Sequence, residues 1–106
     1  MNTGLSDREL VLICRVLESF PNLGKAVLFG SRAKGTARRN SDIDIAVFGL
    51  DSALDVERLS MVLDELPLPY KFDVVGFESI GNPALREHIE RAGVALYEAG
   101  RSVTTS

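Results

Sequence analysis

Residues 28–47 constrain the fold most, because they join two extended apolar runs through a polar, basic loop. The first run breaks at Gly30-Ser31, and the second begins where acidic and aliphatic residues alternate. Successive side chains of a strand point to opposite faces, so Asp42 and Asp44 share one face and the aliphatic residues share the other. Like charges held side by side on a strand oppose folding. The pattern therefore indicates a divalent metal between the two carboxylates.

Composition predicts one compact domain over residues 1–106, with a core from about 5 to 98 and a flexible tail at 99–106. The chain is 45% hydrophobic and 25% charged, which is typical of a soluble globular protein. Its net charge of −3 argues against nucleic acid as the main ligand. The single cysteine favours a reducing cytoplasm. The sequence contains neither a signal peptide nor an apolar run of membrane length, which also favours the cytoplasm and argues against a membrane partner.

Turn and capping signals predict an alternation of helices and strands, which defines an α/β (α+β) fold. A capping box at Ser6 and Glu9 begins the first helix, and Asn82-Pro83 begins the last. We expect Gly93 to end that last helix as a C′ glycine. The strands are predicted at Lys25–Phe29, Asp42–Phe48, Tyr70–Val75 and, at an edge, Val94–Tyr97, with a further helix starting at Asp51 or Ser52.

The strand predicted at Tyr70–Val75 carries a third acid. Alternation places Phe72 on its apolar face and Asp73 on the other. If this strand lies beside the one that holds Asp42 and Asp44, at a spacing of about 4.8 Å, three carboxylates meet on one open face. Cys14 and His88 lie on apolar helix stripes, and we interpret both as structural residues.

These residues suit nucleotidyl transfer, which depends on positioning and on managing negative charge. Mg²⁺ prefers oxygen ligands, and Asp42, Asp44 and Asp73 fit that ligand set. Gly30 allows the backbone to approach a phosphate, and Ser31 can donate a hydrogen bond to it. A Walker A ending and a dinucleotide-binding glycine fingerprint are both absent.

The loop basic residues leave two interpretations open. They lie beside the aspartates rather than over a whole face, which suits a small anionic ligand held together with metal. A solvated loop without ligand is the alternative. The residues concerned are Arg32, Lys34, Arg38 and Arg39.

Gly30-Ser31-Arg32-Ala33-Lys34-Gly35, followed by Ser41-Asp42-Ile43-Asp44, resembles the signature of the minimal nucleotidyltransferases (MNT) of the DNA polymerase beta superfamily. The resemblance implies a small mixed β-sheet with helices packed on one face and the acidic site on the other. It also implies ATP as nucleotide donor and Mg²⁺, as two ions, with Mn²⁺ as a substitute. The catalytic and metal-binding residues would be Asp42, Asp44 and Asp73, and the nucleotide-binding residues Gly30, Ser31, Arg32 and Ser41.

A chain of 106 residues leaves no room for an acceptor domain, so we expect the acceptor hydroxyl on another protein. The resemblance implies an all-helical HEPN-type partner in a toxin–antitoxin pair, to which AMP would be transferred. The alternative is a non-catalytic nucleotide-binding subunit, or an antitoxin that neutralises its partner by binding alone. The donor base, the acceptor and the homo- or hetero-oligomeric state stay open.

Overall fold

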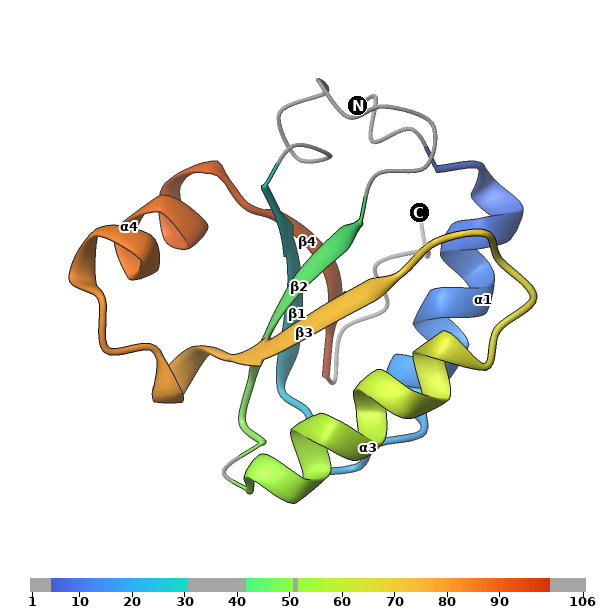
Figure 1. The fold of residues 1–106 in the computed structure, drawn as a ribbon, viewed down its shortest axis with the longest axis horizontal. Coiled ribbons are helices and arrows are strands. Elements are labelled where there is room, and N and C mark those ends of the chain that lie inside the picture. Colours follow the sequence, from blue (N-terminus) through green and yellow to red (C-terminus); the bar gives the residue numbers. More distant parts are fainter. Residues whose placement is uncertain (1–4, 31–41, 51, 100–106) are drawn as a thin grey trace.

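The computed structural model describes residues 5–30, 42–50 and 52–99. The order of helices and strands in this part of the chain is the one that the capping and turn signals predict (Figure 1). The elements are α1 (Asp7–Glu18), β1 (Lys25–Phe29), β2 (Ile43–Phe48), α3 (Ala53–Asp64), β3 (Phe72–Gly76), the 3₁₀ turn η1 (Phe77–Ser79), α4 (Pro83–Ala92) and β4 (Val94–Glu98).

Within the described residues, four strands form one mixed sheet in the order β3-β2-β1-β4. The central strand β1 pairs antiparallel with both β2 and β4, whereas β2 and β3 are parallel. Parallel neighbours need a crossover connection, and α3 supplies it. The predicted small mixed sheet is confirmed, and so is the edge position of the last strand.

The capping box predicted at the start of α1 is present. Ser6 Oγ accepts a hydrogen bond from the Glu9 amide at 3.2 Å, and Glu9 Oε1 accepts one from the Ser6 amide at 2.9 Å. These bonds satisfy amides that a helix start leaves without intrahelical partners. The helix then buries Ile13 and Leu17 completely. Cys14, on the same stripe, is only half-buried, and its thiol donates to the Leu96 carbonyl at 3.3 Å.

The main core lies between the sheet and the pair α1 and α3, to the right of and below the sheet in Figure 1. Alternation along β2 sends Ile43, Ile45 and Val47 into this core, where each is 0% exposed. From α3, Leu59 and Leu63 are equally buried. Burying one such aliphatic side chain contributes roughly 1.5–3 kcal/mol, so this face holds the sheet together.

The other face of the sheet is covered in part by η1 and α4, on the left in Figure 1. A second apolar cluster there contains Val27, Ala46, Phe77 and Ile89. This corrects the expectation that all helices pack on one face. Helix α4 has its own apolar stripe, and the apolar residues on this face of β1 and β2 are the surface that buries it.

The bounds of three strands and the conformation of one glycine differ from prediction. The last strand ends at Glu98 rather than Tyr97. The second strand begins at Ile43 rather than Asp42, and the third covers Phe72–Gly76 rather than Tyr70–Val75. Tyr70 instead donates its hydroxyl to Glu9 Oε2 at 2.9 Å, which joins the segment before β3 to α1. Gly93 has an extended backbone, with φ of −72°, and is not a left-handed C′ residue. A Cβ added there would overlap Val27 and the Ile89 carbonyl, so space rather than conformation requires the glycine.

No helix in the described ranges is both long and apolar enough to cross a membrane.

Candidate active site

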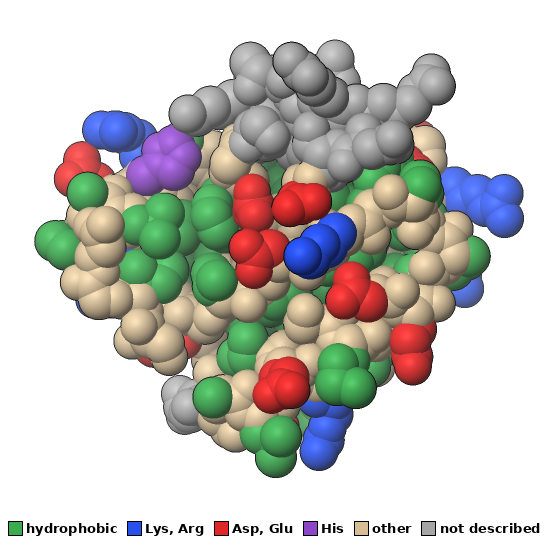
Figure 2. Space-filling model, viewed as in Figure 1, with side chains coloured by type: hydrophobic (Ala, Val, Ile, Leu, Met, Phe, Trp, Pro, Cys, Tyr) green, Lys and Arg blue, Asp and Glu red, His purple; other side chains and the backbone are tan. Residues whose placement is uncertain are grey.

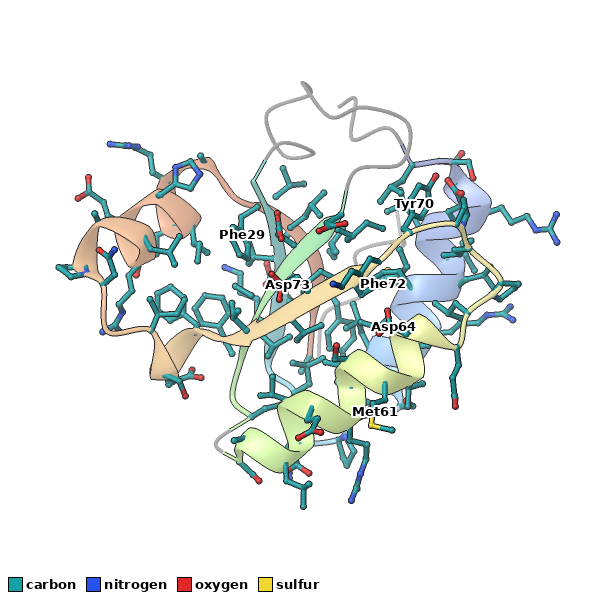
Figure 3. The ribbon with its side chains drawn as sticks, in the orientation of Figure 1. Phe29, Met61, Asp64, Tyr70, Phe72 and Asp73 are labelled. Atoms are coloured by element: carbon teal, nitrogen blue, oxygen red, sulfur yellow. The ribbon has the colours of Figure 1, made fainter. Side chains whose placement is uncertain are left out.

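The pairing of β2 with β3 brings the predicted acids together. Asp44 lies directly opposite Asp73 in the parallel register, with Ile43 opposite Phe72 one residue earlier. Because Ile43 and Phe72 both point into the main core, the two aspartates point away from it. Figure 3 shows Asp73 on the same side of the sheet as Phe29, with Phe72 on the side of the main core. The predicted neighbourhood of the two strands is confirmed.

Asp42 precedes β2 by one residue and is exposed, as is Asp73, whereas Asp44 is partly buried. Burial raises the pKa of the Asp44 carboxyl, and the charges of Asp73 and Asp42 raise that pKa further. Both effects disfavour the carboxylate form. The three acids therefore form one electrostatically coupled group, with Asp44 at its centre.

The backbone conformation of Gly30 and its lack of a side chain both suit its position beside the three aspartates. Its φ of +79° lies in the left-handed region, which residues with a Cβ rarely adopt. A Cβ at this position would lie 2.5 Å from Asp44 Oδ2. Gly30 was predicted to make room for a phosphate, and that remains a prediction. The structure shows a different requirement, which is room for the Asp44 carboxylate.

Lys71 is a residue of this face that the sequence reasoning did not single out. It directly precedes Phe72, so continuing the register of β2 and β3 places it beside Asp42. Figure 2 shows a basic side chain next to acidic side chains near the centre of this view. The signal was available in the sequence, because Lys71 and Asp73 are two positions apart and share a strand face.

The remaining predicted site residues lie outside the described residues. These are the proposed nucleotide-binding residues Ser31, Arg32 and Ser41, and the loop cations Lys34, Arg38 and Arg39. Their roles stay predictions. His88, interpreted as structural, is partly buried on α4.

The acids suit a hard divalent cation by their chemistry, since carboxylate oxygens are the ligands that Mg²⁺ prefers. Among the residues described, no three acidic, histidine or cysteine side chains are gathered closely enough to hold one ion as they stand. Burial raises the pKa of Asp44 most, and the charges of Asp73 and Asp42 raise it further; a cation at this place would relieve that repulsion. Asp44 and Asp73, opposite each other, are the pair that fits best.

The sequence matches a known protein family over most of its length. The family model described as polymerase beta, nucleotidyltransferase matches residues 12–102. The chain therefore belongs to the polymerase beta nucleotidyltransferase family, as the signature indicated. The matched residues include every strand of the described sheet and all three aspartates.

Two similar proteins are named MntA. A probable protein adenylyltransferase MntA from Haemophilus influenzae is 28% identical over 102 residues, which are 93% of this chain and 88% of that protein. A protein adenylyltransferase MntA from Shewanella oneidensis is 39% identical over 54 residues, which are 51% of this chain and 37% of that protein.

Solved structures extend the similarity to complexes. A chain in the crystal structure of a toxin–antitoxin with AMP-PNP superimposes with a TM-score of 0.69 at 30% identity, covering 91% of this chain and 76% of that one. A chain in the structure of a tri-AMPylated HEPN toxin from S. oneidensis in complex with its MNT antitoxin gives 0.64 at 26% identity, covering 84% and 69%.

Proposed function

We propose that this chain is a metal-dependent nucleotidyltransferase that transfers AMP from ATP to a hydroxyl group on a helical, HEPN-type partner protein, as the antitoxin of a toxin–antitoxin pair. The observation that carries the proposal is the pairing of Asp44 with Asp73 in the register of two parallel strands. Relatives named protein adenylyltransferase, and a similar fold in a complex with an AMPylated toxin, support the choice of reaction and partner.

The reaction forms one bond and breaks one bond at the α-phosphorus of ATP. The hydroxyl oxygen of the acceptor attacks this phosphorus, pyrophosphate leaves with the electrons of the broken P–O bond, and the hydroxyl proton is released. Such transfers are accelerated chiefly by positioning and by stabilising developing negative charge. Asp42, Asp44 and Asp73 would hold Mg²⁺, which supplies that stabilisation when it is bound.

The chain's own residues contribute a fixed geometry. The core-facing residues of β2 and β3 hold the register, and the register keeps Asp44 beside Asp73. Gly30 leaves the space that the Asp44 carboxylate occupies. Ser31, Arg32 and Ser41 are proposed to contact the nucleotide phosphates, since hydroxyl and guanidinium groups donate strongly to phosphate oxygens.

The test is co-expression with the helical protein encoded beside it, followed by intact mass spectrometry of that partner. We expect the partner to gain the mass of one or more AMP groups, and Asp44→Asn to remove the gain. A tight complex without mass change, in which Asp44→Asn still neutralises the partner, would support neutralisation by binding alone and contradict the proposal.

Binding of the donor is tested separately by thermal melting with ATP and Mg²⁺, compared with ATP and a chelator. A ligand that binds only the folded state adds RT ln(1 + [L]/Kd) to stability. We therefore expect Tm to rise with millimolar MgATP and the rise to disappear with the chelator. No metal-dependent shift would contradict a working nucleotide site.

A further inference from the structure

Lys71 is a cationic residue that lies on the face of the sheet that carries the three acids of the candidate site. The register places it beside Asp42, and Asp73 is two positions further along the same strand face. Neighbouring strands are about 4.8 Å apart and alternate residues about 7 Å apart, so an extended lysine side chain can reach the space in front of the acids. The Lys71 side chain is exposed, and in the described part of the chain no ion pair within 4.0 Å joins it to an acid.

The backbone on both sides of this side chain is fixed. The Lys71 carbonyl accepts a hydrogen bond from the Ile43 amide at 2.9 Å, which extends the pairing with β2 by one residue. The next amide, that of Phe72, donates to Asp64 Oδ1 of α3 at 3.2 Å. Phe72 itself is buried in the main core. Lys71 therefore has a defined origin and direction, whereas its ammonium group is left to solvent.

A cation at this position weakens the binding of one ligand and strengthens the binding of another. A positive charge beside carboxylates weakens their hold on a divalent cation, because the two cations repel each other. The same charge strengthens the binding of a polyphosphate, which brings several negative charges. A lysine whose backbone is fixed at this point therefore favours an anion over the metal alone.

We propose that Lys71 is a nucleotide-binding residue whose ammonium group contacts a non-bridging oxygen of the donor's phosphate chain. The inference rests on the proposed function, which it deepens by adding a fixed cation to the three carboxylates. The competing interpretation is that Lys71 acts only as a counterion that offsets repulsion among the acids in the ligand-free protein. The two interpretations differ in whether removing the charge changes phosphate binding.

Lys71→Met removes the charge and keeps a long apolar side chain. We expect it to weaken MgATP binding at least about 10-fold in isothermal titration, the lower limit for the loss of one hydrogen bond to a charged group. Inorganic tripolyphosphate with Mg²⁺ should lose a similar factor, whereas AMP, which lacks the β- and γ-phosphates, should change less. Mn²⁺ alone, titrated without nucleotide, should bind more tightly. Lys71→Arg should recover most of the MgATP affinity.

Lys25→Met is the matched control, because Lys25 lies on the same face of the sheet but over the Phe48 ring, 5.6 Å from its centre. Lys25 is paired with Phe48, whereas Lys71 lies beside Asp42, six residues away along β2. The two cations are therefore separated by about 20 Å of strand, more than the screening length of about 8 Å. Lys25→Met should change MgATP affinity less than twofold.

Each outcome decides between the interpretations. If Lys71→Met lowers Tm but leaves MgATP affinity within twofold of the wild type, Lys71 is a counterion and the inference is wrong, while the proposed function stands. If the folded wild-type protein binds neither MgATP nor tripolyphosphate, the inference and the proposed function both fail. If Lys71→Met does not fold, the MgATP affinity of Lys71→Gln is measured instead and compared with that of Lys71→Arg.

Discussion

The two faces of β2 differ in chemistry, one being apolar and the other acidic where Asp44 lies, although their residues alternate along one strand. The face toward α1 and α3 consists of Ile43, Ile45 and Val47, all without exposed surface. The opposite face carries Asp44 beside Asp73, where burial and like charge raise the pKa of Asp44. The core face supplies most of the free energy of folding, and the acidic end of the opposite face, beside the second apolar cluster, uses part of it to hold carboxylates in place. Substitutions at adjacent positions should therefore separate activity from stability.

The largest effect is expected on the acidic face. Asp44→Asn should lower adenylyl transfer at least about 100-fold, because removing one preorganised electrostatic group commonly costs that much, and Asp73→Asn at least about tenfold. Both variants should retain the fold, which circular dichroism checks, while labelled ATP measures transfer. If the Asn variants unfold, these acids are structural and the comparison between the faces fails.

The neighbouring position on the core face should behave in the opposite way. Ile45→Ala removes buried methyl groups and leaves a cavity, so the free energy of unfolding should fall by about 2–5 kcal/mol. Urea denaturation measures this loss. Below the new melting temperature, the folded fraction should transfer AMP at a rate close to the wild type. A folded Ile45→Ala protein without activity would mean that packing and catalysis are not separable here.

Sequence patterns predicted which faces of β2 and β3 enter the main core, because period-two alternation is a local signal. They did not predict that Leu23, Leu50 and Leu96 join it. Strand β1 was predicted with its observed bounds. The neighbourhood of Asp44 and Asp73 was stated only as a condition, since strand order depends on long-range packing. Helix α4 was expected beside the other helices, and only the second apolar cluster shows which face buries its stripe.

The site itself was predicted through residue types, but not through its steric relations. The requirement of Gly30 for space beside Asp44 depends on a contact between residues of different strands, which no local pattern contains. The position of Lys71 beside Asp42, which follows from continuing the β2–β3 register by one residue, depends likewise on long-range pairing.

Gly30→Ala should reduce both stability and transfer activity moderately. A Cβ at φ +79° is strained and would lie against the Asp44 carboxylate, so we expect a loss of about 1–2 kcal/mol in stability together with reduced transfer. Gly81→Ala is the matched control, because a Cβ there would meet no described atom within 4 Å, its chain neighbours aside. It should change stability by less than about 0.5 kcal/mol. Equal effects of the two substitutions would contradict the steric role of Gly30.

The smallest expected effect is a gain in stability. In metal-free protein, Asp44→Asn should raise Tm by a few degrees at pH 7, where about 1 kcal/mol corresponds to about 4–8 °C for a domain of this size. A raised folded-state pKa means that the charged carboxyl opposes folding above that pKa. The gain should therefore shrink as the pH falls and Asp44 becomes protonated in both states. A gain that is independent of pH would argue against charge as its cause.

The parallel pairing of β2 with β3 also has a consequence for how the chain acquires its site during synthesis. The hairpin of β1 and β2 needs only the first fifty residues, but Asp73 reaches Asp44 after α3 has emerged and crossed over the sheet. Non-local pairings of this kind form slowly compared with local ones. A nascent chain on the ribosome would therefore hold Asp44 without Asp73 until β3 docks. Nucleotide binding gained during refolding would report that docking step.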